Sequence, residues 1–269
     1  MNEKRRESIV DASRPSAGRV YDYLLGGHHN FEVDRRVAER IKEILPFMPK
    51  AFMLQRWCLQ DVAMEVTRRG LDVIIDFASG LPTQDHIHTV VPAGTIVIYS
   101  DYDPVVVGYA RDILGDMQNV YYFEADARQP EELLNRPEVQ DILGGRRDVA
   151  LVMWGVSAFL SDDELAHAAQ VLYEWSGPRS CLAFNAQAAD VDEDNPIRHK
   201  IHALYEQMGT PLHNRSLERA RLLLQPWRLG PEGFTSLFDW HGIDTSVMTE
   251  MERKVFGTGG AGYGAYFVK

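Results

Sequence analysis

The chain has 269 residues, of which 45% are hydrophobic and 25% are charged, and these values exclude a collagen-like, disordered or disulfide-scaffold protein. Its net charge of −11 makes nucleic acid an unfavourable partner, because an acidic surface repels a phosphate backbone. We expect a cytoplasmic protein without a membrane partner, since no apolar run approaches the roughly 20 residues of a membrane-spanning helix and the basic N-terminus lacks the apolar stretch of a secretory signal.

Residues 1–70 show helical periodicity and no strong strand pattern, which predicts an N-terminal helical cap. Ser13 or Ser16 can begin the first helix, and the Gly26-Gly27 pair can end it, because glycine enters the left-handed region at little cost. The predicted helices of this cap cover residues 15–25, 31–45 and 50–69.

From residue 71 onward, short apolar runs alternate with helical stretches. Continuous apolar strands indicate a parallel sheet buried between helix layers, and alternation of strand and helix indicates a doubly wound fold. A polar helical insertion is predicted at about 190–224, and the last strand is expected to be antiparallel and near the sheet edge. The predicted strands cover 72–78, 95–101, 120–126, 148–155, 180–186, 234–240 and 262–269, and the predicted helices between them cover 83–90, 104–114, 130–143 and 162–175.

Three of these strands end in a carboxylate, namely Asp76, Asp101 and Asp126. The carboxyl ends of parallel strands meet at one edge of the sheet, and ligands of open α/β sheets bind there. Asp101 follows the first turn by about 20 residues, the spacing at which nucleotide-binding folds place an acid on the ribose hydroxyls. The other interpretation is a helix N-cap, a role that fits Asp103 better.

The turn after the first strand contains Gly80 and lacks the G-x-G-x-x-G pattern of a nicotinamide dinucleotide site. Many ordinary turns need one glycine, so Gly80 alone is weak support for a binding site. An edge lined with carboxylates suits hydroxyls and amines and repels a pyrophosphate. A nucleoside that has a cationic centre and no phosphate fits such an edge, which points to S-adenosyl-L-methionine.

These motifs resemble those of class I S-adenosylmethionine-dependent methyltransferases. More narrowly, the chain is similar to a bacterial family of candidate methyltransferases first catalogued as a domain of unknown function. The resemblance implies a mostly parallel, seven-stranded, Rossmann-like sheet over 71–269 with the helical cap at 1–70. The matching segments are RPSAGRVYDYLLGGHHNFEVDR, DFASGLPT, SDYDPVVVGYAR, EADARQP and DVALVMWGVSAFLSDDE, which together cover nearly the whole chain.

The resemblance also implies roles for individual positions. The first motif would wrap the methionine part and the ribose, the second acid would bind the ribose hydroxyls, the third would bind the adenine amine, and the end of the fourth strand would line the cofactor. The family pattern usually has glycine where this chain has Ala78 and Pro82. The implied cofactor-binding residues are Asp76, Ala78, Gly80, Asp101, Asp103, Asp126, Ala127, Trp154 and Gly155.

Catalytic residues are not identified by any pattern, and the candidates for a general base are Tyr21, His28 and His29. A base is needed only if the acceptor must lose a proton as it attacks. The segment that carries these residues, YDYLLGGHHNF, is either a flap over the cofactor or a helical cap packed on the sheet, with its histidines in solvent.

No metal site is expected. His86 and His88 would point apart on a helix, and Cys58 and Cys181 match no metal spacing, which favours buried thiols in a reducing compartment. His199 and His202 lie in a stretch with the pattern of a solvated amphipathic helix face, and substrate contact is the alternative interpretation.

The predicted function is transfer of a methyl group from S-adenosylmethionine to an unidentified small-molecule acceptor. One alternative is a protein that binds S-adenosylmethionine or S-adenosylhomocysteine without turnover. The other is a nicotinamide oxidoreductase, against which the missing glycine pattern argues.

Overall fold

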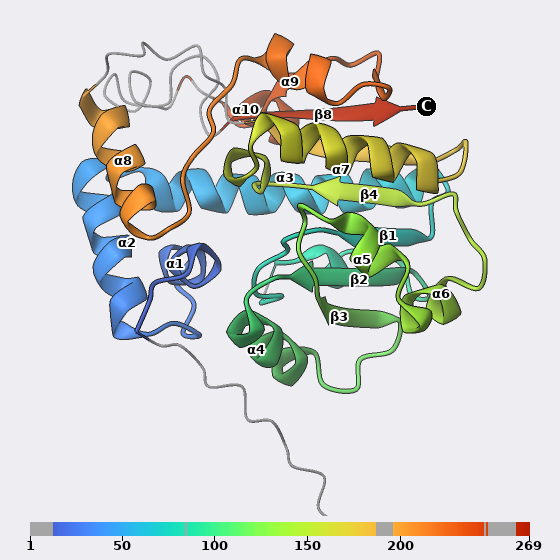
Figure 1. The fold of residues 1–269 in the computed structure, drawn as a ribbon, viewed down its shortest axis with the longest axis horizontal. Coiled ribbons are helices and arrows are strands. Elements are labelled where there is room, and N and C mark those ends of the chain that lie inside the picture. The colour runs from blue at the N-terminus through green and yellow to red at the C-terminus, as the bar shows by residue number, and fades with distance from the viewer. Residues whose placement is uncertain (1–12, 84, 187–195, 245, 247–261) are drawn as a thin grey trace, which may run out of the picture.

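The computed structural model describes residues 13–83, 85–186, 196–244, 246 and 262–269 (Figure 1). Its sheet has the strand order β3-β2-β1-β4-β5-β8-β6, with β7 paired to β8. Strands β1 to β5 run parallel, and β8 is antiparallel to its three neighbours. The strands are β1 (Val73–Asp76), β2 (Ile96–Asp101), β3 (Val120–Glu124), β4 (Ala150–Met153), β5 (Cys181–Ala186), β6 (Arg228–Leu229), β7 (Thr235–Ser236) and β8 (Tyr263–Val268).

The mostly parallel α/β fold predicted from the apolar runs is confirmed, and β8 is antiparallel and next to the edge strand β6, as expected. The helices are α1 (Ala17–Leu24), α2 (Glu32–Ile44), α3 (Met48–Arg68), α4 (Pro104–Leu114), α5 (Pro130–Leu134), α6 (Pro137–Leu143), α7 (Asp162–Trp175), α8 (Pro196–Gln207), α9 (Leu217–Leu223) and α10 (Leu237–His241), with 3-10 turns η1 (Ile87–Thr89) and η2 (Ser157–Phe159).

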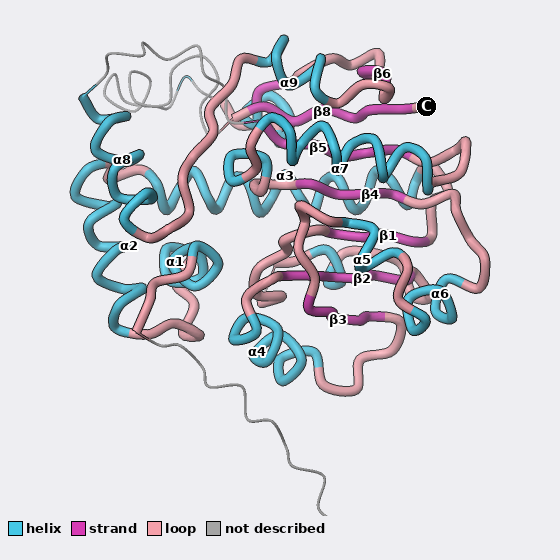
Figure 2. Tube along the Cα trace, viewed as in Figure 1, coloured by secondary structure: helices cyan, strands magenta, loops and turns pink. Residues whose placement is uncertain are grey.

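Helices cover both faces of the sheet (Figure 2). Successive residues of a strand point to opposite faces, so Ile75 of β1 joins the apolar core under α5, α6, α7 and α9, whereas Ile74 joins the core under α3, α4 and α10. Both isoleucines are fully buried, which explains why the strand is apolar throughout rather than alternating.

The N-terminal helices form a third apolar cluster with α8 (Figure 1). Val20 of α1, Ile41 of α2 and Phe52 of α3 contribute to it, together with Ile201 and Tyr205 of α8. The rest of α3 packs on the sheet itself, since Val62 and Val66 belong to the core beneath it. Helix α3 therefore connects the N-terminal helices to the sheet.

Three sequence predictions of local structure are wrong. The predicted helix at 83–90 is a loop with only η1, because Asp85 adopts a left-handed backbone with φ of 65°. The predicted helix at 130–143 divides into α5 and α6, because Pro137 starts a new helix and disfavours helical backbone just before it. The predicted strand at 234–240 forms only β7 and then α10, which Ser236 caps by accepting a hydrogen bond from the Asp239 amide.

The predicted helical segment at 190–224 contains α8 and α9, and its residues 190–195 lie outside the described residues, as do residues 1–12 of the N-terminal segment.

Candidate functional site

Two carboxylates end adjacent parallel strands. Asp76 is the last residue of β1 and Asp101 the last of β2, and the residue partner of Asp76 on β2 is Tyr99. Both acids are buried, with 2% and 6% of their surface exposed. The third predicted acid, Asp126, lies two residues beyond β3 and is held by Arg128, whose Nε donates to its Oδ2 at 2.8 Å. The structure thus brings Asp76 and Asp101 together inside the protein, whereas Asp126 is partly exposed and paired.

The turn that follows β1 is locked by hydrogen bonds to β2. The Ser79 amide donates to the Ser100 carbonyl at 2.8 Å, and the Gly80 amide donates to Asp101 Oδ2 at 3.1 Å. Ala78 and Gly80 both adopt left-handed backbone, with φ of 54° and 64°. The glycine takes this conformation at little cost, but Ala78 stores strain there.

Replacing Ala78 with glycine is expected to raise the free energy of unfolding by about 1 kcal/mol, because glycine removes the left-handed strain of an alanine. Urea denaturation measures the effect. Ala125 is a matched control, since it is buried at the end of β3 and is not among the residues with positive φ, so Ala125→Gly should lower stability. A less stable Ala78→Gly variant would contradict the strain argument.

Asp101 is also fixed from its other side. Its Oδ1 accepts the amide of Asp103 at 3.0 Å, and Asp103 caps α4 by accepting the Val105 amide at 2.9 Å. Burial is the main cause that raises the pKa of Asp101 to about 6. The charge of Asp103 acts in the same direction, while hydrogen bonds from the backbones of Asp103, Gly80 and Tyr102 act to lower the pKa. An ionised carboxylate has about four acceptor sites, so Asp101 can still accept a ligand hydroxyl beside these backbone bonds.

Two buried side chains, neither of which the sequence predicts to support the turn, contact its backbone carbonyls. Tyr122 of β3 donates its hydroxyl to the Gly80 carbonyl at 2.6 Å. His86 accepts the Ile87 amide on Nδ1, which leaves the proton on Nε2, and Nε2 lies 3.3 Å from the Ser79 carbonyl. Burial keeps the pKa of His86 well below its usual value, so the ring stays neutral. These contacts give His86 a structural role rather than that of a metal ligand.

Helix α1 and the first part of α3 lie at this edge of the sheet (Figure 1). A Cβ added to Gly18 of α1 would lie 4.0 Å from the Gly80 Cα, so the helix approaches the turn closely. From α3, Gln55 accepts a hydrogen bond on its backbone carbonyl from Trp154 Nε1 at 3.0 Å. Trp154 directly follows β4, and therefore both helices close over the strand ends.

The next residue of α3, Arg56, is the most unusual feature of the site, and it was not among the residues predicted from the sequence. It is 3% exposed, yet its Nε and Nη1 have no hydrogen-bond partner. Asp76 Oδ2 is likewise buried without a partner. Burial raises the pKa of Asp76 to about 7, against the opposing influence of Arg56. A buried guanidinium and a buried carboxylate with unsatisfied atoms are costly unless a ligand completes them.

The candidate general bases lie in different surroundings. Tyr21 stacks its ring 5.4 Å from the Arg56 guanidinium and donates its hydroxyl to the Phe52 carbonyl at 3.3 Å. His28 is exposed. His29 packs edge-on against Tyr109 of α4, with ring centroids 5.2 Å apart. Of the three candidates, Tyr21 is thus the one in contact with Arg56.

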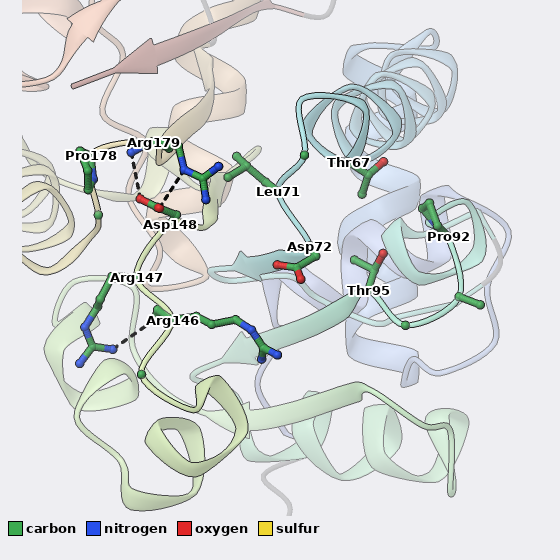
Figure 3. A pocket seen from close by; sticks show the side chains of 15 residues that line it. Thr67, Leu71, Asp72, Pro92, Thr95, Arg146, Arg147, Asp148, Pro178 and Arg179 are labelled. Carbon is green, nitrogen blue, oxygen red and sulfur yellow. Dashed lines mark hydrogen bonds and ion pairs between the residues drawn. The ribbon is translucent and has the colours of Figure 1, made fainter.

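An open cavity of about 880 Å³ lies at the opposite edge of the sheet, at the amino ends of β1, β2, β4 and β5 (Figure 3). Its arginines serve the local structure: Arg146 donates to the carbonyl of Leu143 at the end of α6, and Arg179 pairs with Asp148 at 3.0 Å. Helix carbonyl ends gather at this edge, which disfavours anionic ligands. Ligands of parallel sheets bind at the other edge, so the carboxyl ends remain the candidate site although this cavity lies at the amino ends.

In the described part of the chain, no group of three or more His, Cys, Asp or Glu side chains is placed to hold a metal ion. Over the same residues, no helix combines the length and the apolar character that crossing a bilayer requires. Cys58 and Cys181 are buried free thiols, as predicted.

Comparison with known proteins identifies the family. The family model of S-adenosyl methyltransferases matches residues 3–263. No curated protein sequence matches the chain. A candidate methyltransferase from Thermobifida fusca is 26% identical, with a TM-score of 0.83 over 97% of both chains. A DUF574 family protein from Streptomyces avermitilis is 24% identical, with a TM-score of 0.83 over 97% of this chain and 99% of that one.

More distant solved structures share the fold. Human N-acetylserotonin methyltransferase, solved in complex with S-adenosylmethionine, is 15% identical, with a TM-score of 0.52 over 96% of this chain and 64% of that one. The resemblance stated from the sequence is therefore confirmed. The chain belongs to the S-adenosyl methyltransferase family, whose cofactor is S-adenosyl-L-methionine.

Proposed function

We propose that the chain transfers the methyl group of S-adenosylmethionine to a small-molecule acceptor at the carboxyl edge of β1 to β4, beneath α1 and α3. The observation that carries this proposal is the pair of buried groups with unsatisfied atoms, Arg56 and Asp76. An unsatisfied buried polar group costs about 1–3 kcal/mol, and a charged one costs more. A ligand with both a carboxylate and an ammonium group would satisfy the two together, and the methionine end of the cofactor has both.

The remaining parts of the cofactor have candidate partners along the same edge. We assign the ribose hydroxyls to Asp101, which is ionised at neutral pH because its pKa is about 6. The adenine amine is assigned to Asp126, with the Ala127 backbone beside it. We assign Ala78 and Gly80 to the close approach of the backbone to the cofactor at the turn. Trp154 and Gly155 are assigned to lining the cofactor at the end of β4. Asp103 supports Asp101 through its backbone amide.

Bound S-adenosylmethionine supplies a methyl group that is already activated on a sulfonium. The protein is then needed to align the acceptor and to exclude water. Burial raises the pKa of Tyr21, so its hydroxyl stays protonated at neutral pH. We therefore assign Tyr21 to orienting Arg56 rather than to proton abstraction, and we propose no general base.

The helices above the site limit the size of the acceptor. Gly18 and Gln55 lie against the turn and the end of β4, so an acceptor must fit beneath α1 and α3. A nucleic acid is disfavoured by this cover and by the net charge of −11. The proposal includes a cytoplasmic location, which the free thiols Cys58 and Cys181 support.

Calorimetric titration of ligand-stripped protein with S-adenosylmethionine, S-adenosylhomocysteine and NADH tests the cofactor site. We expect micromolar binding of the first two alone, and binding of NADH alone would contradict the proposal. Formation of S-adenosylhomocysteine with a panel of small acceptors then distinguishes an enzyme from a protein that only binds the cofactor.

Replacing Asp101 with alanine is expected to weaken S-adenosylhomocysteine binding about tenfold, because a charge-assisted hydrogen bond is worth roughly 1.5–3 kcal/mol. Asp72 offers a matched control, since it is an exposed aspartate beside the other end of β1. Asp72→Ala should bind like the wild type. Unchanged affinity in Asp101→Ala would show that the site lies elsewhere.

A further inference from the structure

Arg19 is a buried cation on α1, within the N-terminal segment whose function the cofactor contacts above do not explain. It is 2% exposed and joins three parts of the chain. Its Nε donates to Asp34 of α2 at 2.8 Å, its Nη1 donates to Asp103 at 2.8 Å, and its Nη2 donates to the Arg14 carbonyl at 2.7 Å. The guanidinium also lies over the Phe31 ring, 5.2 Å from its centroid.

A continuous series of hydrogen bonds leads from Arg19 to the turn after β1. Asp103 accepts from Arg19 on Oδ2, and its own amide donates to Asp101 Oδ1 at 3.0 Å. Asp101 Oδ2 in turn accepts the Gly80 amide at 3.1 Å. The close approach of Gly18 to Gly80 provides a second contact between α1 and the same turn. Displacement of α1 would therefore disturb Asp101 and the turn together.

Arg19 is positioned to compensate the negative charges of two aspartates, Asp34 and Asp103. The Asp34 side chain is fully buried, and its other hydrogen bonds come from the backbone amides of Ser16 and Phe31. The charge of Asp103 raises the pKa of the neighbouring Asp101, and Arg19 is the cation that pairs with Asp103. Loss of the guanidinium would leave the carboxylates of Asp34 and Asp103 buried without their cation, and an uncompensated buried charge destabilises the folded protein.

We propose that Arg19 is a positioning residue of the cofactor site: through Asp103 it holds Asp101 and the turn at 77–81 in their binding geometry and makes the N-terminal helices a fixed part of that site. The effect on cofactor affinity rests on the function proposed above. The mechanical link between α1 and the turn is independent of that function, and it can be measured without ligand.

The first test is hydrogen exchange of ligand-free protein. Arg19→Met should speed amide exchange about tenfold or more in peptides covering 77–81 and 101–105, because both lose their anchor. Arg40→Met is the matched control, since Arg40 lies on α2 and pairs on the surface with Glu43. It should leave both peptides unchanged. Unchanged exchange of the two peptides in Arg19→Met would overturn the proposal.

The second test is a double-mutant cycle on S-adenosylhomocysteine affinity. Arg19→Met should weaken binding about tenfold in the wild-type background and less than about twofold when Asp101 is already alanine, because coupled residues are not additive. Arg19→Lys should restore part of the affinity. Equal weakening in both backgrounds would mean that Arg19 acts only on overall folding, which overturns the proposal.

If Arg19→Met does not fold, the variant Asp103→Asn tests the proposal by the same measurements. This variant keeps an oxygen for the Val105 amide and removes the charge that pairs with Arg19. It should speed exchange at 77–81 and lose its effect on affinity in the Asp101→Ala background. Wild-type protein that does not bind S-adenosylhomocysteine would contradict the proposed function, and hydrogen exchange would then judge the role of Arg19 separately.

Discussion

Replacing Arg56 with methionine is expected to weaken S-adenosylhomocysteine binding about a hundredfold, while the ligand-free protein stays as stable as the wild type or becomes more stable. Removing one partner of a buried, hydrogen-bonded charge pair costs about 2–5 kcal/mol, and about 1.4 kcal/mol corresponds to a factor of ten. In the ligand-free protein, Arg56 Nε and Nη1 have no hydrogen-bond partner. Its removal therefore relieves a desolvation cost. Two losses offset this gain: the contact with the Tyr21 ring, worth about 1 kcal/mol, and the attraction between Arg56 and Asp76, which Asp76 answers by taking up a proton.

The ligand that discriminates this role is 5′-methylthioadenosine, which keeps the adenosine and the sulfur but lacks the amino acid end. Its affinity should be the same for the wild type and for Arg56→Met, whereas the affinity for S-adenosylhomocysteine should differ. Calorimetry with both ligands and thermal unfolding without ligand measure the two effects. Equal weakening for both ligands, or a clear loss of stability, would mean that Arg56 supports the fold instead of a carboxylate.

The carboxylates of the site could be predicted from the sequence because parallel strands impose their arrangement. Asp76 and Asp101 each follow an apolar run, and the end of such a run in a parallel sheet lies at the ligand-binding edge. The turn after β1 was predictable for the same reason. The sequence shows Ala78 only as a departure from the family pattern, and a single sequence does not reveal that its backbone is left-handed.

Arg56 could not be predicted, because its environment depends on where α3 extends past the ends of the strands. A signal does exist in the sequence: Gln55 and Arg56 interrupt the apolar face of α3, and both are buried in the structure. An arginine within a helical pattern is usually interpreted as solvent-exposed, and nothing local indicates otherwise. The burial of Arg19 could not be predicted either, because its partner Asp103 is 84 positions away in the sequence.

Affinity for S-adenosylhomocysteine is expected to rise about thirtyfold or more from pH 5.5 to pH 8. Burial raises the pKa of Asp76 to about 7 and that of Asp101 to about 6. Both must be ionised to accept an ammonium group and ribose hydroxyls, and at pH 5.5 only a few per cent of molecules would have Asp76 ionised. Calorimetry across this pH range measures the slope. An affinity independent of pH would contradict the assignment of both carboxylates.

The same two carboxyl groups give the ligand-free protein the opposite pH dependence. Their pKa values in the folded protein lie above the value of about 3.9 in an unfolded chain, so between about pH 4 and pH 7 the folded state binds more protons than the unfolded state. Their contribution to stability therefore falls as the pH rises through that window. Stabilisation by S-adenosylhomocysteine in thermal unfolding should grow over the same interval. In Asp76→Asn, the midpoint of this ligand-induced stabilisation should move down to about pH 6, because Asp101 alone then titrates. A midpoint that stays near pH 7 would assign the titration to another group.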